Sequence, residues 1–269
     1  MEKFIKNVFS FSSTIPEQDW LFNWKHLIIV FSVMAFVIFF CMLYYRKRKL
    51  RQKIFLILSG VFMLLLEGSR LLWNALVLKD AGIKLTFWNV TSLDLFSISV
   101  WFSAIFLFIA VGLGPKKRLS QLMFNFIFTV TAIVAIIDII YPIGLQETVH
   151  MYHFANLQYL VSRALVLLVA LFLGCTDWLD NSLDDIWMAI LNLIFMIGLG
   201  VGLYYLSDKL IDIIYIQECP WLTMAGIKVE SPWHMLIVGL FFFGMQVIIY
   251  LPFDIYRKIK YKTWKPAKF

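Results

Sequence analysis

Long apolar runs dominate the chain, and short polar stretches separate them. Each run has about 20 residues or more, the length that a helix needs to cross the hydrocarbon core of a bilayer. This pattern predicts an all-α, polytopic membrane helix bundle with about seven transmembrane helices. The expected spans are 27–45, 54–78, 87–113, 119–141, 154–174, 186–206 and 232–253.

Composition agrees with a membrane protein rather than a soluble one. Hydrophobic residues make up 61% of the 269 residues and charged residues only 15%, far from the balance of a soluble domain. We expect one membrane domain, 27–253, after an extracytoplasmic or interfacial segment, 1–26, and before a basic cytoplasmic tail, 254–269. Pro252 is expected to mark where the last helix bends or ends. The predicted location is the cell membrane.

Basic residues cluster on one side of the predicted spans. Residues 46–53 and 116–118 fall in connections on that side, and the carboxyl-terminal tail adds more. The positive-inside rule then predicts an amino terminus outside and a carboxyl terminus in the cytoplasm. The net charge of +7 sits at the ends of apolar runs, where it suits anionic lipid. Membrane lipids are therefore the expected partners, and nucleic acid is not.

Ionisable residues interrupt the apolar runs, beginning with Glu67 and Arg70 in the stretch 64–74. Such groups are costly within a bilayer, so they face protein or trapped water and usually mark a site. At a rise of roughly 1.5 Å per residue, Glu67, Arg70, Asp94 and Arg163 would lie about 10 to 17 Å below the outer ends of their spans. We expect them to share one layer in the outer half.

Helical spacing adds further polar residues to this layer. The expected faces are Asp94 with Ser97 and Trp101, and Asn156 with Tyr159 and Arg163. Glu67 and Arg70, three residues apart, can pair within one helix. Arg163 has no acid nearby in its own span and is expected to pair with either Asp94 or Asp138.

Two interpretations of the layer stay open. It could form a pocket open to the outer leaflet or outer face, or it could be a set of ion pairs that fix helix registry without a substrate. The candidate substrate-binding residues are Glu67, Arg70, Asp94, Ser97, Asn156 and Arg163, with Asp138, His150 and His153 at the rim. Glu147, His150 and His153 recur at intervals of three, but no fourth ligand is specified, so a surface loop or rim is favoured over a metal site. No metal or other cofactor is expected.

Several short motifs follow one another in a distinctive order between about residues 60 and 255. They are Glu67 with Trp73, the stretch 92–97, His153 with Phe154 and 157–160, and the stretches 231–233 and 250–253. This order resembles the YwaF-like integral membrane proteins, whose eukaryotic relatives include transmembrane protein 164, an acyltransferase acting on phospholipids. The resemblance implies a helical membrane protein that acts on or binds lipid.

The resemblance also implies that this chain departs from the family's catalytic pattern. The family's acyl-accepting cysteine falls on Phe96, and its two histidines fall on Asp94 and Arg163. Covalent catalysis needs a nucleophile and a base that activates it, and Phe96 can be neither. A charge pair of Asp94 and Arg163 would replace the catalytic set, either as structure or to bind a polar headgroup. Arg163 suits a phosphate oxygen.

Three functions follow as hypotheses. The first is a protein that binds lipid or amphiphile without acyl transfer, alone or as a subunit beside another membrane protein. The second is an active lipid-modifying acyltransferase with an altered catalytic set, in which Ser92, Ser97 or Ser99 would be the nucleophile. The third is a small transporter or channel component that uses the charged layer as a path. The lack of an internal repeat disfavours the third.

Overall fold

The computed structural model describes residues 8–9, 24–91, 93–141, 152–180, 182–209, 212 and 233–261. Every element in these ranges is helical, and seven helices there are long and apolar enough to cross a membrane, which confirms the predicted bundle. The spans are α2 (Trp24–Tyr44), α3 (Lys49–Asp80), α5 (Leu95–Leu113), the continuous α6 (Arg118–Phe126), η1 (Ile127–Thr131) and α7 (Ala132–Ile140), then α8 (Phe154–Cys175), η2 (Leu183–Asp185) with α9 (Ile186–Leu206), and α11 (Trp233–Tyr261).

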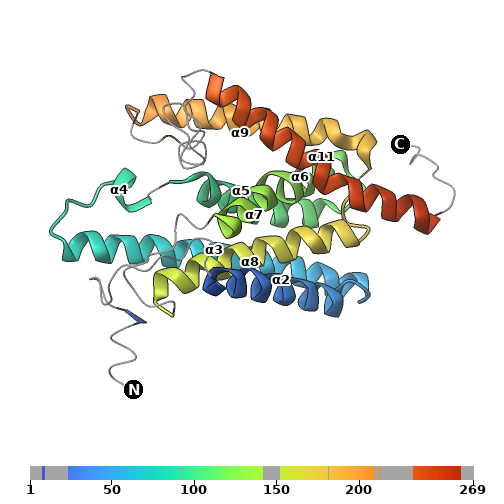
Figure 1. Cartoon of the computed structure of the whole chain (residues 1–269), viewed down its shortest axis with the longest axis horizontal. Coiled ribbons are helices and arrows are strands. Elements are labelled where there is room, and N and C mark those ends of the chain that lie inside the picture. Colours follow the sequence, from blue (N-terminus) through green and yellow to red (C-terminus); the bar gives the residue numbers. More distant parts are fainter. Residues whose placement is uncertain are drawn as a thin grey trace.

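The helices lie in three layers (Figure 1). One layer holds α2, α3 and α8, the middle layer holds α5 to α7, and the third holds α9 and α11. In the middle span Arg118–Ile140, 72% of the most apolar window is buried inside the protein, against 17% in α2 and in Met235–Ile255. The apolar side chains that α2 and α11 expose therefore face the lipid, which solvates them as well as protein would.

The two ends of the bundle differ in charge. At one end α3 finishes, α4 (Phe87–Thr91) follows and α8 begins, and we call this the α4 end. At the opposite end α2 finishes, α3 begins and the basic residues 46–53 and 116–118 lie, and we call this the basic end. The positive-inside rule predicts that the basic end is cytoplasmic.

The third span begins later than the apolar run suggested. Residues 87–91 form the separate helix α4, and α5 starts at Leu95 with Asp94 as its N-cap. The Asp94 backbone is extended, and its Oδ1 accepts a hydrogen bond from the Ser97 N–H at 2.5 Å, as capping carboxylates do. Asp94 therefore lies at the cap of α5 rather than within a span, next to Ser97.

Pro252 does not end the last helix. The helix α11 continues through it to Tyr261, so the first residues of the predicted tail are helical. A proline removes one backbone donor and crowds the preceding turn. Neighbouring helices can offset that loss within a membrane bundle.

Candidate functional site

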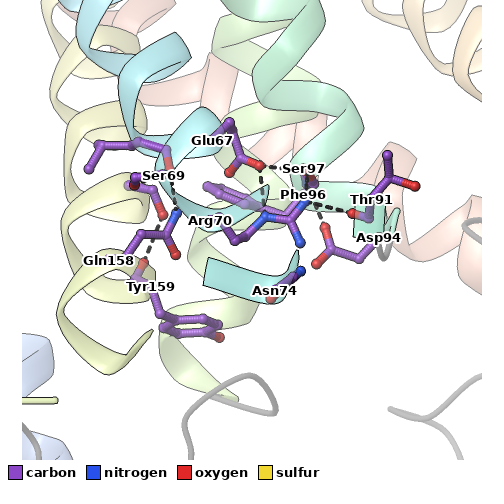
Figure 2. Close-up of polar contacts among 12 residues, drawn as sticks. Glu67, Ser69, Arg70, Asn74, Thr91, Asp94, Phe96, Ser97, Gln158 and Tyr159 are labelled. Carbon is purple, nitrogen blue, oxygen red and sulfur yellow. Dashed lines mark hydrogen bonds and ion pairs between the residues drawn. The ribbon is translucent and has the colours of Figure 1, made fainter. Parts of the chain in front are cut away.

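The first charged cluster joins α3 to α4 and α5 (Figure 2). Arg70 Nε and the Ser97 hydroxyl donate to the same oxygen, Glu67 Oε2, at 2.9 and 2.7 Å. Arg70 Nη2 also donates to Ser97 Oγ at 2.5 Å and to the Thr91 carbonyl at 3.0 Å. The predicted pairing of Glu67 with Arg70 is confirmed, and it binds three helices together.

Glu67 is the most enclosed member of this cluster. Its exposed fraction is 0%, whereas the Arg70 side chain keeps 14%. Its second oxygen, Oε1, has no hydrogen-bond donor among the described residues. A carboxylate removed from water needs its partners to repay the loss of hydration, so this cluster retains one unsatisfied acceptor.

The second charged cluster joins α8 to α7 and α5. Arg163 donates to Asp138 Oδ2 from Nη2 at 2.7 Å and from Nε at 3.1 Å. Its guanidinium lies against two rings, with 3.7 Å to the Phe96 centroid and 3.6 Å to the Tyr159 centroid. The Tyr159 hydroxyl donates to the Asp138 carbonyl at 2.7 Å. Of the two acids that the sequence offered to Arg163, Asp138 is the partner.

The start of α5 connects the two clusters. Phe96 packs on Arg163 and the next residue, Ser97, binds Glu67. Gln158 adds a link from α8 to α3 through its Nε2, which donates to the Leu66 carbonyl at 3.2 Å. The charged groups of both clusters are engaged with protein, and their contacts tie α3, α5, α7 and α8 together. The expectation that Glu67, Arg70, Asp94 and Arg163 share one layer in the outer half stays a prediction.

The remaining predicted site residues lie at the starts of α5 and α8, some exposed and some buried. Asp94 is exposed at the helix start, and its ion pair with Arg163 does not form, because Arg163 pairs with Asp138. Asn156 is buried in α8. His153 is the N-cap of α8, where its Nδ1 accepts from the Ala155 N–H at 3.3 Å.

The series Glu147, His150 and His153, spaced like metal ligands, lies largely outside the described residues. Glu147 and His150 both lie there, and of the predicted rim residues the structure describes Asp138 and His153. Within the described part of the chain, no three His, Cys, Asp or Glu residues lie close enough to hold a metal ion.

A groove between α2, α3 and α8 was not foreseen from the sequence. Its cavity volume is about 480 Å³. The lining residues are Ser32, Val33, Phe36, Phe40, Tyr44, Phe55, Leu58, Ser59, Phe62, Leu160, Val161, Ala164, Leu165 and Leu168. This set is almost entirely apolar and aromatic, as in sites that accept hydrophobic ligands. Below, these residues are called the α2/α3/α8 groove.

A neutral polar cluster nearer the basic end was also missed. Asn125 donates from Nδ2 to the Tyr250 hydroxyl, and Asn192 Nδ2 donates to Asn125 Oδ1 at 3.1 Å. Thr129 donates to the Asn125 carbonyl at 2.8 Å. In the sequence, Asn125 and Asn192 each place an amide within an apolar run. A search for charged residues alone does not find them.

Comparison with known proteins gives one match. A family model described as the TMEM164 family matches residues 21–252 of the chain. No curated protein and no solved structure matches it.

Proposed function

The chain belongs to the TMEM164 family, and from this premise we propose that it binds a membrane lipid or a similar amphiphile without transferring an acyl chain. The α2/α3/α8 groove is the observation that carries the proposal. It offers a shaped apolar surface at membrane depth, between helices that the charged clusters hold in place.

The groove has the size and lining for a hydrocarbon chain. Its volume of about 480 Å³ lies within the roughly 300–1,000 Å³ of small-molecule sites. Lipid tails are as apolar as the protein, so burial alone gives little preference for the groove over the bilayer. The gain must come from close packing against rings such as Phe36, Phe40 and Phe62, which many small dispersion contacts can supply.

The groove favours a headgroup at the basic end. Tyr44, the last residue of α2, lines it there. Towards the α4 end the lining stops at Ser32 and Leu160, about 12 and 9 Å short of the starts of their helices. We therefore place the polar group of the ligand at the basic end, although the sequence suggested the outer half.

In this proposal the charged residues hold the walls of the groove in place and do not bind the lipid headgroup. Arg163 is only 5% exposed and its donors meet Asp138, so a lipid phosphate would have to displace that carboxylate. Glu67 is fully buried. Both lie on helices that form walls of the groove, α3 and α8, and their ion pairs fix these walls against α5 and α7.

We propose no acyl transfer because none of the described candidate residues offers an accessible nucleophile. Phe96, where the resemblance puts the family's cysteine, is buried against Arg163 and carries no reactive group. The Ser97 hydroxyl is buried and bound to Glu67, and the Ser99 hydroxyl is buried and donates to the Phe96 carbonyl at 2.7 Å. Neither hydroxyl is accessible to an ester, and Ser92 lies outside the described residues.

The test places a large side chain in the groove from α3 and compares it with the same change outside the groove. Leu58 lines it and Leu65 lies two turns further along α3, on nearly the same face but outside the lining. Mass spectrometry would measure the lipids that co-purify with wild type, Leu58→Trp and Leu65→Trp. We expect Leu58→Trp to lose the retained lipid and Leu65→Trp to keep it, with equal thermal unfolding midpoints. Equal lipid recovery from all three would reject the groove.

Two further measurements separate the alternatives. Asp94→Asn changes an exposed acid at the α4 end and should retain the lipid. If this variant lost the lipid, the headgroup would bind at the α4 end instead. Acyl exchange between two labelled phospholipids in proteoliposomes tests the enzyme hypothesis. We expect no exchange above empty vesicles, and exchange that requires the protein would establish an acyltransferase with an altered catalytic set.

A further inference from the structure

Two cysteines from different helices meet near the basic end of the bundle. Cys41 lies in the last turn of α2, and Cys175 is the last residue of α8. Both thiols are free, and the Cys41 thiol donates a hydrogen bond to the Cys175 sulfur. The third cysteine of the chain, Cys219, lies outside the described residues. The fold therefore brings together two thiols that are far apart in the sequence.

Helix packing holds this pair of thiols together. Val33, Val37 and Cys41 recur at intervals of four along α2, and all three are buried, so they form one inward stripe. Among the described elements, α2 packs mainly on α8. Cys41 is only 4% exposed, and Cys175 packs against the same core from α8. A disulfide needs its sulfur atoms within reach of a bond of roughly 2 Å, and thiols already in hydrogen-bonding contact come close to that condition.

The two thiols differ in their access to a reagent. Cys175 is partly exposed at the end of its span, whereas Cys41 is enclosed. A partly exposed thiol beside an enclosed one suits a pair in which the first is oxidised and the second resolves it. The basic end is predicted to face the cytoplasm, where thiols stay reduced unless an oxidant is present. A disulfide would therefore form there only during oxidation.

We propose that Cys41 and Cys175 form a reversible disulfide that links α2 to α8 when a peroxide is present. The Cys175 thiol gives up its proton, and its sulfur attacks one oxygen of hydrogen peroxide, which leaves a sulfenic acid and one water. The Cys41 sulfur then attacks the sulfenic sulfur, and the S–O bond breaks to release a second water. In total, two thiols are oxidised to one disulfide and one peroxide is reduced to two waters. A dithiol reductant restores both thiols by exchange.

The disulfide would join two walls of the α2/α3/α8 groove, and this part of the inference rests on the proposed function. Phe40 precedes Cys41 and Tyr44 follows it by one turn, and both line the groove. Only 17% of the most apolar window of α2 is buried, so little of this helix is held by protein. A bond from its end to α8 would restrain the movement by which a lipid enters or leaves.

Peptide mapping of the wild type tests the bond directly. The reduced full chain in detergent would be treated with hydrogen peroxide, blocked with a maleimide and digested without reductant. We expect one linked peptide pair that contains Cys41 and Cys175, and its separation by dithiothreitol. Recovery of both cysteines as maleimide-labelled thiols would overturn the proposal. Their irreversible oxidation, or a bond from either of them to Cys219, would overturn it too.

Serine variants supply the matched controls. Cys219→Ser should still lose two maleimide labels on oxidation, whereas Cys175→Ser should lose none. Equal unfolding midpoints of the reduced proteins would show that both variants fold. A loss of labels in Cys175→Ser equal to that in wild type would show that another pair of thiols reacts, and the assignment would be wrong.

Lipid exchange tests the effect on the groove. Mass spectrometry would follow the replacement of co-purified lipid by deuterated phosphatidylglycerol before and after oxidation. We expect exchange at least about threefold slower in oxidised wild type, because a restrained wall opens less often, and no change in Cys175→Ser. A linked protein that exchanges lipid at the unlinked rate would reject control of the groove. If neither form retains lipid, the proposed function fails, while the peptide map still decides the disulfide.

Discussion

Arg163 donates from Nε and Nη2 to a single oxygen, Asp138 Oδ2, and its guanidinium also packs on the rings of Phe96 and Tyr159. A planar cation can make both kinds of contact at once, and lysine has no such plane. The resemblance placed a family histidine at this position. The surroundings that the chain provides are instead those of a guanidinium.

We predict that Arg163→Ala destabilises the protein by roughly 3–5 kcal/mol, because Asp138 would lose its counter-charge within the membrane. Arg163→Lys should fall between this variant and wild type, since it keeps the charge but loses the stacking. The unfolding midpoint of the purified protein in detergent measures both effects.

The matched control removes both charges. Asp138→Leu/Arg163→Met should recover most of the lost stability, because no unpaired charge is left. If the double variant were as unstable as Arg163→Ala, the ring contacts rather than the ion pair would hold α7 to α8.

At the scale of elements, the spans could be predicted because bilayer thickness dictates the length of an apolar run. Their ends depend on weaker local signals. Residues 87–113 read as one run by hydropathy, yet Asp94 caps a helix and separates α4 from α5. That capping pattern was visible in the sequence, whereas the passage of α11 through Pro252 depends on its neighbours.

The site could be predicted only in part. Charged residues stand out in apolar spans, so the pairing of Glu67 with Arg70 could be predicted. The partner of Arg163 was open, because the sequence placed two acids at similar depth and did not show that Asp94 caps α5 while Asp138 meets Arg163. The groove arises where three helices leave a gap, and no pattern within one helix encodes such a gap.

The contact between α8 and α11 requires a glycine. A Cβ on Gly174 would lie 2.6 Å from Phe253 and 2.8 Å from Phe128, both closer than atoms can pack. We predict that Gly174→Ala costs roughly 1–3 kcal/mol in unfolding free energy through overpacking. Gly198→Ala in α9, where a Cβ meets open space, should be neutral or slightly stabilising. Similar midpoints for both variants would show that the rings move aside.

Polar contacts also attach α11, which buries little of its surface. Tyr250 is fully buried and its hydroxyl accepts from Asn125. We predict that Tyr250→Phe lowers the unfolding free energy by roughly 1–3 kcal/mol, because the Asn125 amide then lacks an acceptor. Asn125→Leu/Tyr250→Phe should cost less than the two single changes together. Strict additivity in urea unfolding would show that the two side chains are not coupled.

For the whole molecule, an odd number of spans has a topological consequence. Seven described spans place the residue before α2 and the residue after α11 on opposite sides of the membrane. The basic residues 46–53 and 116–118 gather at the end where α11 also leaves the bundle. The lining of the α2/α3/α8 groove reaches this same end at Tyr44.

We predict that this basic end faces the cytoplasm. A fluorescent protein that folds only in the cytoplasm should be bright when fused after residue 269, and alkaline phosphatase, active only outside, should be inactive there. Fused into the turn at Gly82, at the α4 end, the two reporters should give the opposite result. The paired fusions control for expression, since each reporter is active at one site. Phosphatase activity at residue 269 would reverse the orientation, and the Tyr44 end of the α2/α3/α8 groove would then meet lipids of the outer leaflet.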